Sequence, residues 1–220
     1  MTSEQVFFLI VAGVMLLFGF PVHEFSHAFA ADRLGDRTAR YMGRLSLDPR
    51  RHFDPVGGIV LLITALAGVP IGWAKPTPVN PSNLAYGHRG EALVALAGPT
   101  SNLLMAAVAA VSVRLVESSP TLQDAINTSD IARFLYNVLA VFVFINVLLF
   151  VFNLLPVPPL DGWAVLKGLV SPRTAFQLRQ VEQYGIFLLV AVFFVGGRII
   201  FPIADRIFGL LTGHPFFLLR

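Results

Sequence analysis

The sequence contains no cysteine, so it can form neither disulfide bonds nor a thiolate metal site, and any metal must be bound by histidine and carboxylate groups. Charged residues are also scarce, at 13% of the 220 residues, whereas 55% are hydrophobic. The basic residues form no cluster with aromatic residues, which argues against a nucleic-acid-binding protein. The first residues lack the basic segment that opens a signal peptide, so we expect the first apolar run to be retained. This composition is typical of a protein that crosses the lipid bilayer several times.

A short polar motif, His23-Glu24-Phe25-Ser26-His27, ends the first apolar run. On a helix, His23 and His27 lie on one face, so a ring nitrogen of each can reach one Zn²⁺. Glu24 is then placed as a general base on water rather than as a ligand. The alternative is accidental spacing of polar residues on a solvated helix face. A charged residue at mid-membrane costs about 2.5–3.5 kcal/mol, however, so these residues beside an uncharged run predict a metal site.

The fold class that we predict is an all-α polytopic membrane protein. Three apolar runs are long enough to span the membrane, namely Val6 to Ala31, Ala92 to Val116 and Phe134 to Leu155. We expect a fourth span over Tyr184 to Phe201, and we predict a single domain over residues 1–220. Its catalytic core covers about residues 6–166, followed by one or two further helices over 167–220.

The distribution of arginine predicts the orientation of these spans. The polar loop from Asp32 to Asp54 contains six arginines, whereas Glu117 to Asp130 contains no lysine or arginine. The positive-inside rule therefore places the first loop in the cytoplasm, the second outside, and the N-terminus outside. The Arg-rich loop and the segment before Ala92 must then both lie in the cytoplasm. The short apolar run Val56 to Ile71 between them should therefore enter the membrane and return without crossing it. We expect a protein of a prokaryotic cell membrane with its site near the cytoplasmic face.

The stretch from Trp73 to Pro81 has prolines at alternate positions, which force an extended backbone and exclude a helix. The amides of Lys75, Thr77 and Val79 could pair with an unwound substrate by strand addition. The alternative is a rigid loop that only supports the fold. Trp73, Lys75 and Thr77 are therefore candidate substrate-binding residues. Asn102 is a further candidate, because it either lines the site or joins helices by hydrogen bonding.

The third span ends in a proline-rich turn, Asn153 to Gly162, which must lie within protein or line a cavity if it is at membrane depth. Asp161 lies in this turn, at the membrane face where the first span delivers its histidines. Because a catalytic zinc site needs three protein ligands, we predict Asp161 as the third. Asn153 could donate a hydrogen bond to an oxyanion or could serve helix packing. His52 we interpret as a loop histidine that supports the site, rather than as a fourth ligand.

Taken together, these motifs resemble the site-2 protease family of intramembrane zinc metalloproteases. The stretches that carry the resemblance are His23 to His27, Asn153 to Gly162, Ala97 to Asn102 and Gly72 to Pro76. The resemblance implies one zinc ion bound by His23, His27 and Asp161, with Glu24 as the base and Asn153 assisting the transition state. It also implies that the substrates are membrane proteins with a transmembrane helix.

Two features separate this chain from longer members of that family, since the sequence shows neither a PDZ insertion nor a CBS domain. Substrate gating that depends on those domains is therefore not expected. Two other functions remain open from the residues alone. One is a membrane transporter of metal ions or protons that uses the same histidine and aspartate residues, although no inverted repeat is visible. The other is a zinc-bearing binding protein without activity, although no catalytic position is missing.

Overall fold

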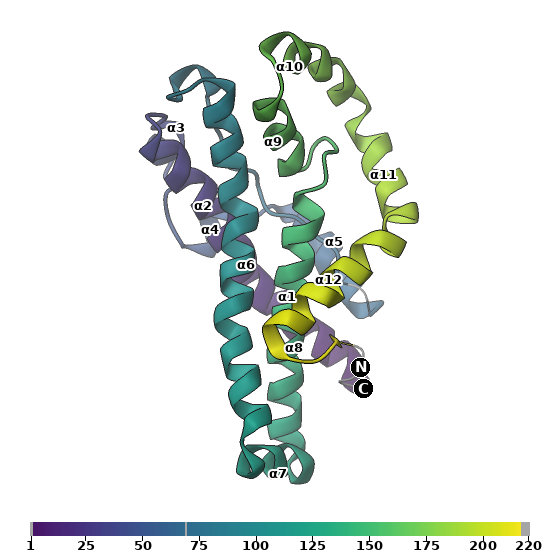
Figure 1. Ribbon diagram of the computed structural model, residues 1–220. Coiled ribbons are helices and arrows are strands. Elements are labelled where there is room, and N and C mark those ends of the chain that lie inside the picture. The colour runs from purple at the N-terminus through teal and green to yellow at the C-terminus, as the bar shows by residue number, and fades with distance from the viewer. Residues whose placement is uncertain (1, 69, 217–220) are drawn as a thin grey trace.

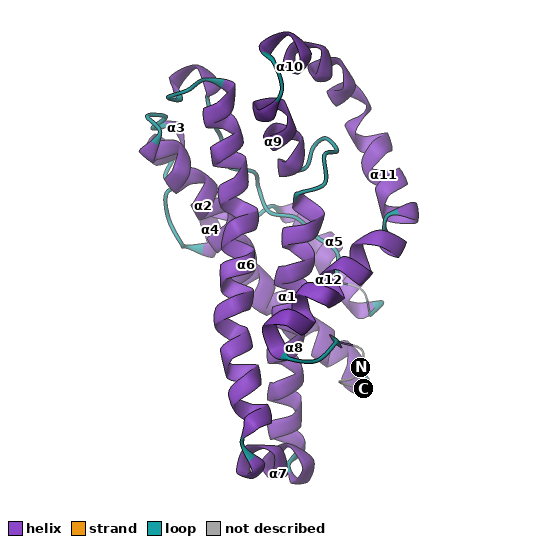
Figure 2. Cartoon of the chain, in the orientation of Figure 1, coloured by secondary structure: helices purple, strands orange, loops and turns teal. Residues whose placement is uncertain are grey.

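The computed structural model describes residues 2–68 and 70–216. These residues form helices joined by loops and contain no β-strand, which confirms the predicted all-α class (Figures 1 and 2). Three helical segments are long and apolar enough to cross a membrane: Ser3–Arg33, His88–Ser118 and Asp130–Asn153. The first two contain the apolar runs Val6 to Ala31 and Ala92 to Val116, and the third covers the run Phe134 to Leu155 except for its last two residues. The fold is therefore compatible with a multi-pass membrane protein.

The first span consists of α1 (Ser3–Val14), a π-helical turn η1 (Met15–Gly19) and α2 (Phe20–Arg33). Pro21 lies just after this π-helical turn inside one continuous helical segment, and its nitrogen has no hydrogen to donate to the preceding turn. The backbone leaves α geometry in the turn before this proline, and such π turns are frequent near functional sites. The motif His23 to His27 follows directly in α2.

Helix α6 (His88–Ser118) is the central element, because α2, α8, α9 and α12 all pack against it (Figure 1). Its sequence presents a buried residue at nearly every fourth position, as a helix with one inward face requires. These residues are Gly90, Val94, Gly98, Asn102, Ala106, Ala110 and Val113. Helix α7 (Pro120–Thr128) joins α6 to α8 (Asp130–Asn153) at the end of the molecule opposite α9 (Figure 1).

Helix α5 (Pro55–Leu66) is too short to span a membrane, since 12 residues rise about 18 Å against a hydrocarbon layer of about 30 Å. The chain then turns and runs back along the same helix. Thr64 Oγ1 accepts a hydrogen bond from the Ile71 amide at 2.8 Å and donates to the Ile71 carbonyl at 2.9 Å. A Cβ atom on Gly57 would lie 2.2 Å from the Trp73 carbonyl oxygen, so the returning chain contacts the helix directly. This hairpin-like path fits the predicted entry and return of the segment.

The basic loop between α2 and α5 contains two short helices, α3 (Thr38–Tyr41) and α4 (Pro49–His52). Asp36 in this loop is fully buried and accepts hydrogen bonds from the Asn80 amide at 2.7 Å and from Asn83 Nδ2 at 3.0 Å. Burial by itself raises the pKa of the Asp36 carboxyl, but hydrogen bonds from Thr38, Asn80 and Asn83 hold that pKa below its ordinary value. The ionised carboxylate therefore ties the basic loop to the chain just before η2 (Pro81–Asn83) and α6.

The region after the third span forms α9 (Asp161–Leu169), α10 (Pro172–Leu178), η3 (Arg179–Tyr184), α11 (Gly185–Val195) and α12 (Gly197–Thr212). The fourth span predicted over Tyr184 to Phe201 is not one continuous helix, because the helical segments Pro172–Val192 and Gly197–Thr212 meet at an angle of 74°; the pair forms a fourth span only if the two segments together count as one broken span. The break falls at Gly196 and Gly197, where glycine removes the side chain that would restrict a change of direction.

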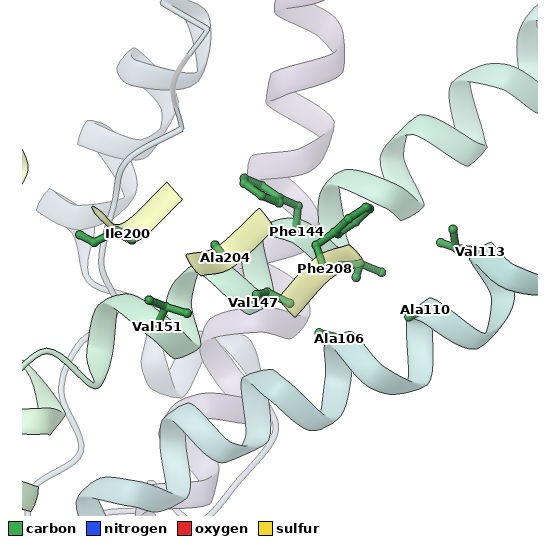
Figure 3. Close-up of a cluster of buried hydrophobic side chains, with 10 residues drawn as sticks. Ala106, Ala110, Val113, Phe144, Val147, Val151, Ile200, Ala204 and Phe208 are labelled. Atoms are coloured by element: carbon green, nitrogen blue, oxygen red, sulfur yellow. The ribbon is translucent and has the colours of Figure 1, made fainter. Parts of the chain in front are cut away.

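Helix α12 lies against α6 and α8 rather than continuing the line of α11 (Figure 1). Its residues Ile200, Ala204 and Phe208 pack into a cluster with side chains such as Ala110 and Val147 (Figure 3). Helix α12 thus completes the largest hydrophobic cluster of the described residues.

Candidate metal centre and active site

Helix α2 places His23 and His27 one turn apart, with their Nε2 atoms 3.0 Å from each other. Asp161, the first residue of α9, brings its Oδ2 atom to 3.3 Å from each of these nitrogens. All three residues are at least half-buried, and the side chain of His27 is only 9% exposed. The structure therefore brings together the three residues that the sequence predicted as metal ligands.

The spacing of these donor atoms fits a zinc ion. Zinc in a tetrahedral site lies about 2.0–2.2 Å from nitrogen and oxygen ligands, which puts neighbouring ligand atoms about 3.3 Å apart. The observed separations are 3.0, 3.3 and 3.3 Å. Three side chains leave one tetrahedral position open, as catalytic zinc sites require.

Hydrogen bonds to the Nδ1 atoms of both histidines leave their Nε2 lone pairs free to bind a metal ion between the three donor atoms. The Phe142 carbonyl can only accept, so it receives the Nδ2–H of Asn146 at 2.9 Å. Asn146 Oδ1 then accepts from Asn102 Nδ2 at 2.9 Å, which turns Asn102 Oδ1 toward His23 Nδ1 at 2.5 Å. His23 must donate from Nδ1 and keep its Nε2 lone pair free. His27 does the same by donating from Nδ1 to the Val94 carbonyl at 2.8 Å.

Asn102 is fully buried and bonded on both sides of its amide, so these contacts favour its role between helices over contact with substrate. Replacing Asn102 with alanine should weaken zinc affinity about 10–100-fold, because the His23 ring loses the partner that fixes its tautomer and direction. Competition with a chelator measures this affinity. Thr100→Ala, an exposed position two residues away, is the control and should bind zinc normally. Normal zinc affinity in Asn102→Ala would contradict the role assigned to this amide.

Gly98 on α6 leaves the space that the two histidine rings occupy. A Cβ atom there would lie 2.2 Å from His27 Nε2 and 2.7 Å from His23 Nε2. Sequence analysis named the Ala97 to Asn102 stretch as part of the family resemblance and did not identify the glycine as part of the site. The lack of a side chain at Gly98 was the available signal, but the sequence could not show which neighbour approaches it.

Helix α9 holds Asp161 in place through contacts with α8 and α6. A Cβ on Gly162 would lie 2.3 Å from the Leu154 carbonyl oxygen, so the start of α9 packs directly on the end of α8. Further along α9, Lys167 is buried and its Nζ lies 2.7 Å from Glu182 Oε1 and 3.6 Å from Glu91 Oε1. These contacts fix the third ligand relative to the histidines on α2.

Glu24 lies beside the cluster and is held by the loop between α5 and η2. Its Oε2 accepts a hydrogen bond from the Thr77 amide at 2.7 Å, and its backbone carbonyl accepts one from Thr77 Oγ1 at 2.9 Å. Sequence reasoning placed Glu24 and Thr77 in one site but did not predict that they contact each other. Among the described residues, no hydrogen bond is formed to Glu24 Oε1.

The prediction that Lys75 and Thr77 offer free amides for strand addition is wrong in this structure. The Lys75 amide donates to the His52 carbonyl at 2.8 Å, and the Thr77 amide donates to Glu24. Trp73, which is 46% exposed, and the exposed Lys75 side chain remain candidates for substrate contact.

Two other predicted residues lie outside the donor cluster. Asn153 is the last residue of α8, and its Nδ2 donates to the Leu149 carbonyl at 3.0 Å, so its predicted role with an oxyanion stays a prediction. The buried His52 donates from Nε2 to the Ser46 carbonyl at 2.6 Å, which fits a histidine that supports the loop.

The fold and the site together define a helical membrane protein with a His-His-Asp centre of the kind that binds zinc. The chain matches the family model described as Peptidase family M50 over residues 11–196. It therefore belongs to the M50 family, the site-2 protease family, which confirms the resemblance seen in its motifs.

Curated relatives agree with this assignment. "Putative zinc metalloprotease YwhC" of Bacillus subtilis is 34% identical over 194 residues, covering 87% of this chain and 84% of that protein. "Putative zinc metalloprotease Rip2" of Mycobacterium tuberculosis is 34% identical over 196 residues, covering 86% of this chain and 67% of that protein. No solved structure matches the chain with statistical significance. The family and these names support a zinc metalloprotease of the M50 type, and they do not favour a transporter.

Proposed function

We propose that the chain is an intramembrane zinc endopeptidase that hydrolyses peptide bonds in or near the transmembrane segments of membrane proteins. The observation that carries this proposal is the His23, His27 and Asp161 cluster on and beside a membrane-spanning helix, with Glu24 next to it. One zinc ion per chain, held by these three residues, would supply the Lewis acidity that polarises a substrate carbonyl.

The residues of the chain supply the proton transfers. Glu24 accepts the proton of the attacking water at Oε1, because Oε2 is held by the Thr77 amide. The same carboxyl then passes that proton to the leaving amine. Asn153 Nδ2 carries two N–H groups, and one of them donates to the Leu149 carbonyl, so the other is the group that would stabilise the oxyanion.

The substrate must be extended when it is cut, because a helix shields its own carbonyl groups. The exposed Trp73 and Lys75 side chains lie on the non-helical loop that contacts Glu24, which makes this loop our candidate for the surface that holds the unwound segment (Figure 2).

Comparing membrane-protein fragments in cells tests the proposed function. Cells with the wild-type chain should contain fragments cut in or near transmembrane segments, and cells with Glu24→Gln should contain the uncut proteins. Identical fragment patterns in the two strains would contradict a protease function in those cells.

We propose that the basic loop and the α5 hairpin face the cytoplasm and that α7 faces outward. The chain has no cysteine, so a single introduced cysteine reports one position. Cysteine at Arg50, Lys75 or Arg173, all exposed, should react with a membrane-impermeant reagent only from the cytoplasmic side. Cysteine at the exposed Asp124 should react only from outside. Labelling of position 75 from outside would contradict the return of α5 to the cytoplasmic face.

A further inference from the structure

Arg44 differs from the other arginines of the basic loop because its guanidinium is buried. The residue is 6% exposed, whereas the side chain of Arg50 is 93% exposed. Its Nη1 donates to the Arg51 carbonyl, and its Nη2 donates to the carbonyls of Lys75 and Pro76, the latter at 2.9 Å. Burying a charge against neutral carbonyl groups costs desolvation energy. The positive-inside rule requires only an arginine in the loop and does not explain why the Arg44 guanidinium is buried.

The carbonyl of Pro76 and the amide of Thr77 belong to one peptide group. That group is planar, and in the trans form its C=O and N–H point in opposite directions. Arg44 binds the oxygen at 2.9 Å, and Glu24 Oε2 accepts from the nitrogen at 2.7 Å. Fixing the oxygen therefore fixes the direction in which the N–H meets Glu24.

Two further contacts limit how the loop can move. The Lys75 amide is bound to the His52 carbonyl at 2.8 Å, and the Asn80 amide is bound to Asp36 at 2.7 Å. Arg44 differs from these two contacts because it binds the Pro76–Thr77 peptide group itself, the same group whose N–H donates to Glu24. The positive guanidinium and the negative carboxylate also lie on opposite sides of this peptide dipole, an arrangement that strengthens both hydrogen bonds.

We propose that Arg44 is a positioning residue for Glu24 and that it acts through the Pro76–Thr77 peptide group. The inference rests on the proposed function, because it assigns a role in aiming the general base. Arg44 does not contact the metal ligands through any described hydrogen bond, since His23 and His27 are held by Asn102 and Val94. Its loss should therefore misplace Glu24 and leave zinc bound.

A double-mutant cycle tests the inference on purified protein with a fixed transmembrane substrate. Arg44→Gln should lower kcat about 10–100-fold, the size of effect expected when a catalytic group is misplaced by about 1 Å. Zinc content and KM should stay at wild-type values. Thr77→Pro removes the amide hydrogen and should lower kcat similarly, whereas Thr77→Val keeps it and should have the smaller effect. Arg50→Gln is the matched control in the same loop and should retain kcat.

The double variant Arg44→Gln/Thr77→Pro should be no slower than the slower single variant, because both changes remove the same interaction. Arg44→Lys can still donate to one carbonyl, so it should have a higher kcat than Arg44→Gln. It also tests the role of Arg44 if the glutamine variant fails to fold. Losses of kcat that multiply in the double variant would overturn the inference, and so would zinc content that falls in parallel with kcat. Full activity in Arg44→Gln, with Glu24→Gln inactive, would overturn only this inference. An active Glu24→Gln would overturn the assignment of Glu24 as the base and this inference with it, whereas a wild-type chain that does not cleave the substrate would overturn the proposed function.

Discussion

Replacing Glu24 with glutamine should lower kcat about 10²–10⁴-fold, the usual contribution of a positioned general base. The amide side chain keeps the size of the carboxyl but cannot take a proton from water. Zinc should remain bound, because the donor atoms belong to His23, His27 and Asp161. The measurement is the rate of cleavage of a transmembrane substrate together with zinc content per chain.

Glu24→Asp is the matched control, because it keeps a base but shortens the side chain. It should retain more activity than Glu24→Gln and the same zinc content. Cleavage by Glu24→Gln at the wild-type rate would show that another group is the base.

Replacing Gly98 with alanine should abolish zinc binding and therefore activity. The added methyl would lie 2.2 Å from His27 Nε2 and 2.7 Å from His23 Nε2. The rings cannot simply turn away, since their Nδ1 atoms are bound to the Val94 carbonyl and to Asn102. This expected loss runs against helix propensity, which by itself favours alanine over glycine in a helix interior by about 0.8–1.0 kcal/mol.

Gly13→Ala is the control for this substitution, since a Cβ at Gly13 on α1 has no neighbouring atom within 4 Å. It should bind zinc as the wild-type chain does. Metal analysis of the two purified variants distinguishes a local clash from a general effect of removing a membrane-helix glycine. Full zinc occupancy in Gly98→Ala would contradict the placement of α6 against the histidines.

Much of this site could be predicted from the sequence because its chemistry is local. The two histidines and Glu24 occupy one turn of helix, and their spacing alone gives their shared face. Asp161 could be predicted because its proline-rich turn must lie at the same membrane face as the histidines. The long apolar runs likewise predicted the three spans, since their length is set by the bilayer.

The features of the site and fold that the sequence did not predict depend on contacts between segments that are far apart in the chain. Arg44 looks like its neighbouring arginines in sequence, and only the packing of the loop shows that its charge is buried. Asn146 lies in an apolar helix, and its part in the chain of hydrogen bonds to His23 depends on the facing helix α6. The break at Gly196 was missed because the run from Tyr184 to Phe201 is mostly apolar and, apart from Arg198, has no charged residue.

The most direct test of the account is zinc-dependent cleavage in lipid vesicles that contain only the purified chain and a single-span substrate. With zinc bound, mass spectrometry should find new peptide ends in or near the substrate's transmembrane segment. Removal of zinc with a chelator should stop this cleavage, and added zinc should restore it for the wild-type chain but not for Glu24→Gln. Cleavage that persists at the wild-type rate after zinc is removed, or in Glu24→Gln, would contradict the account.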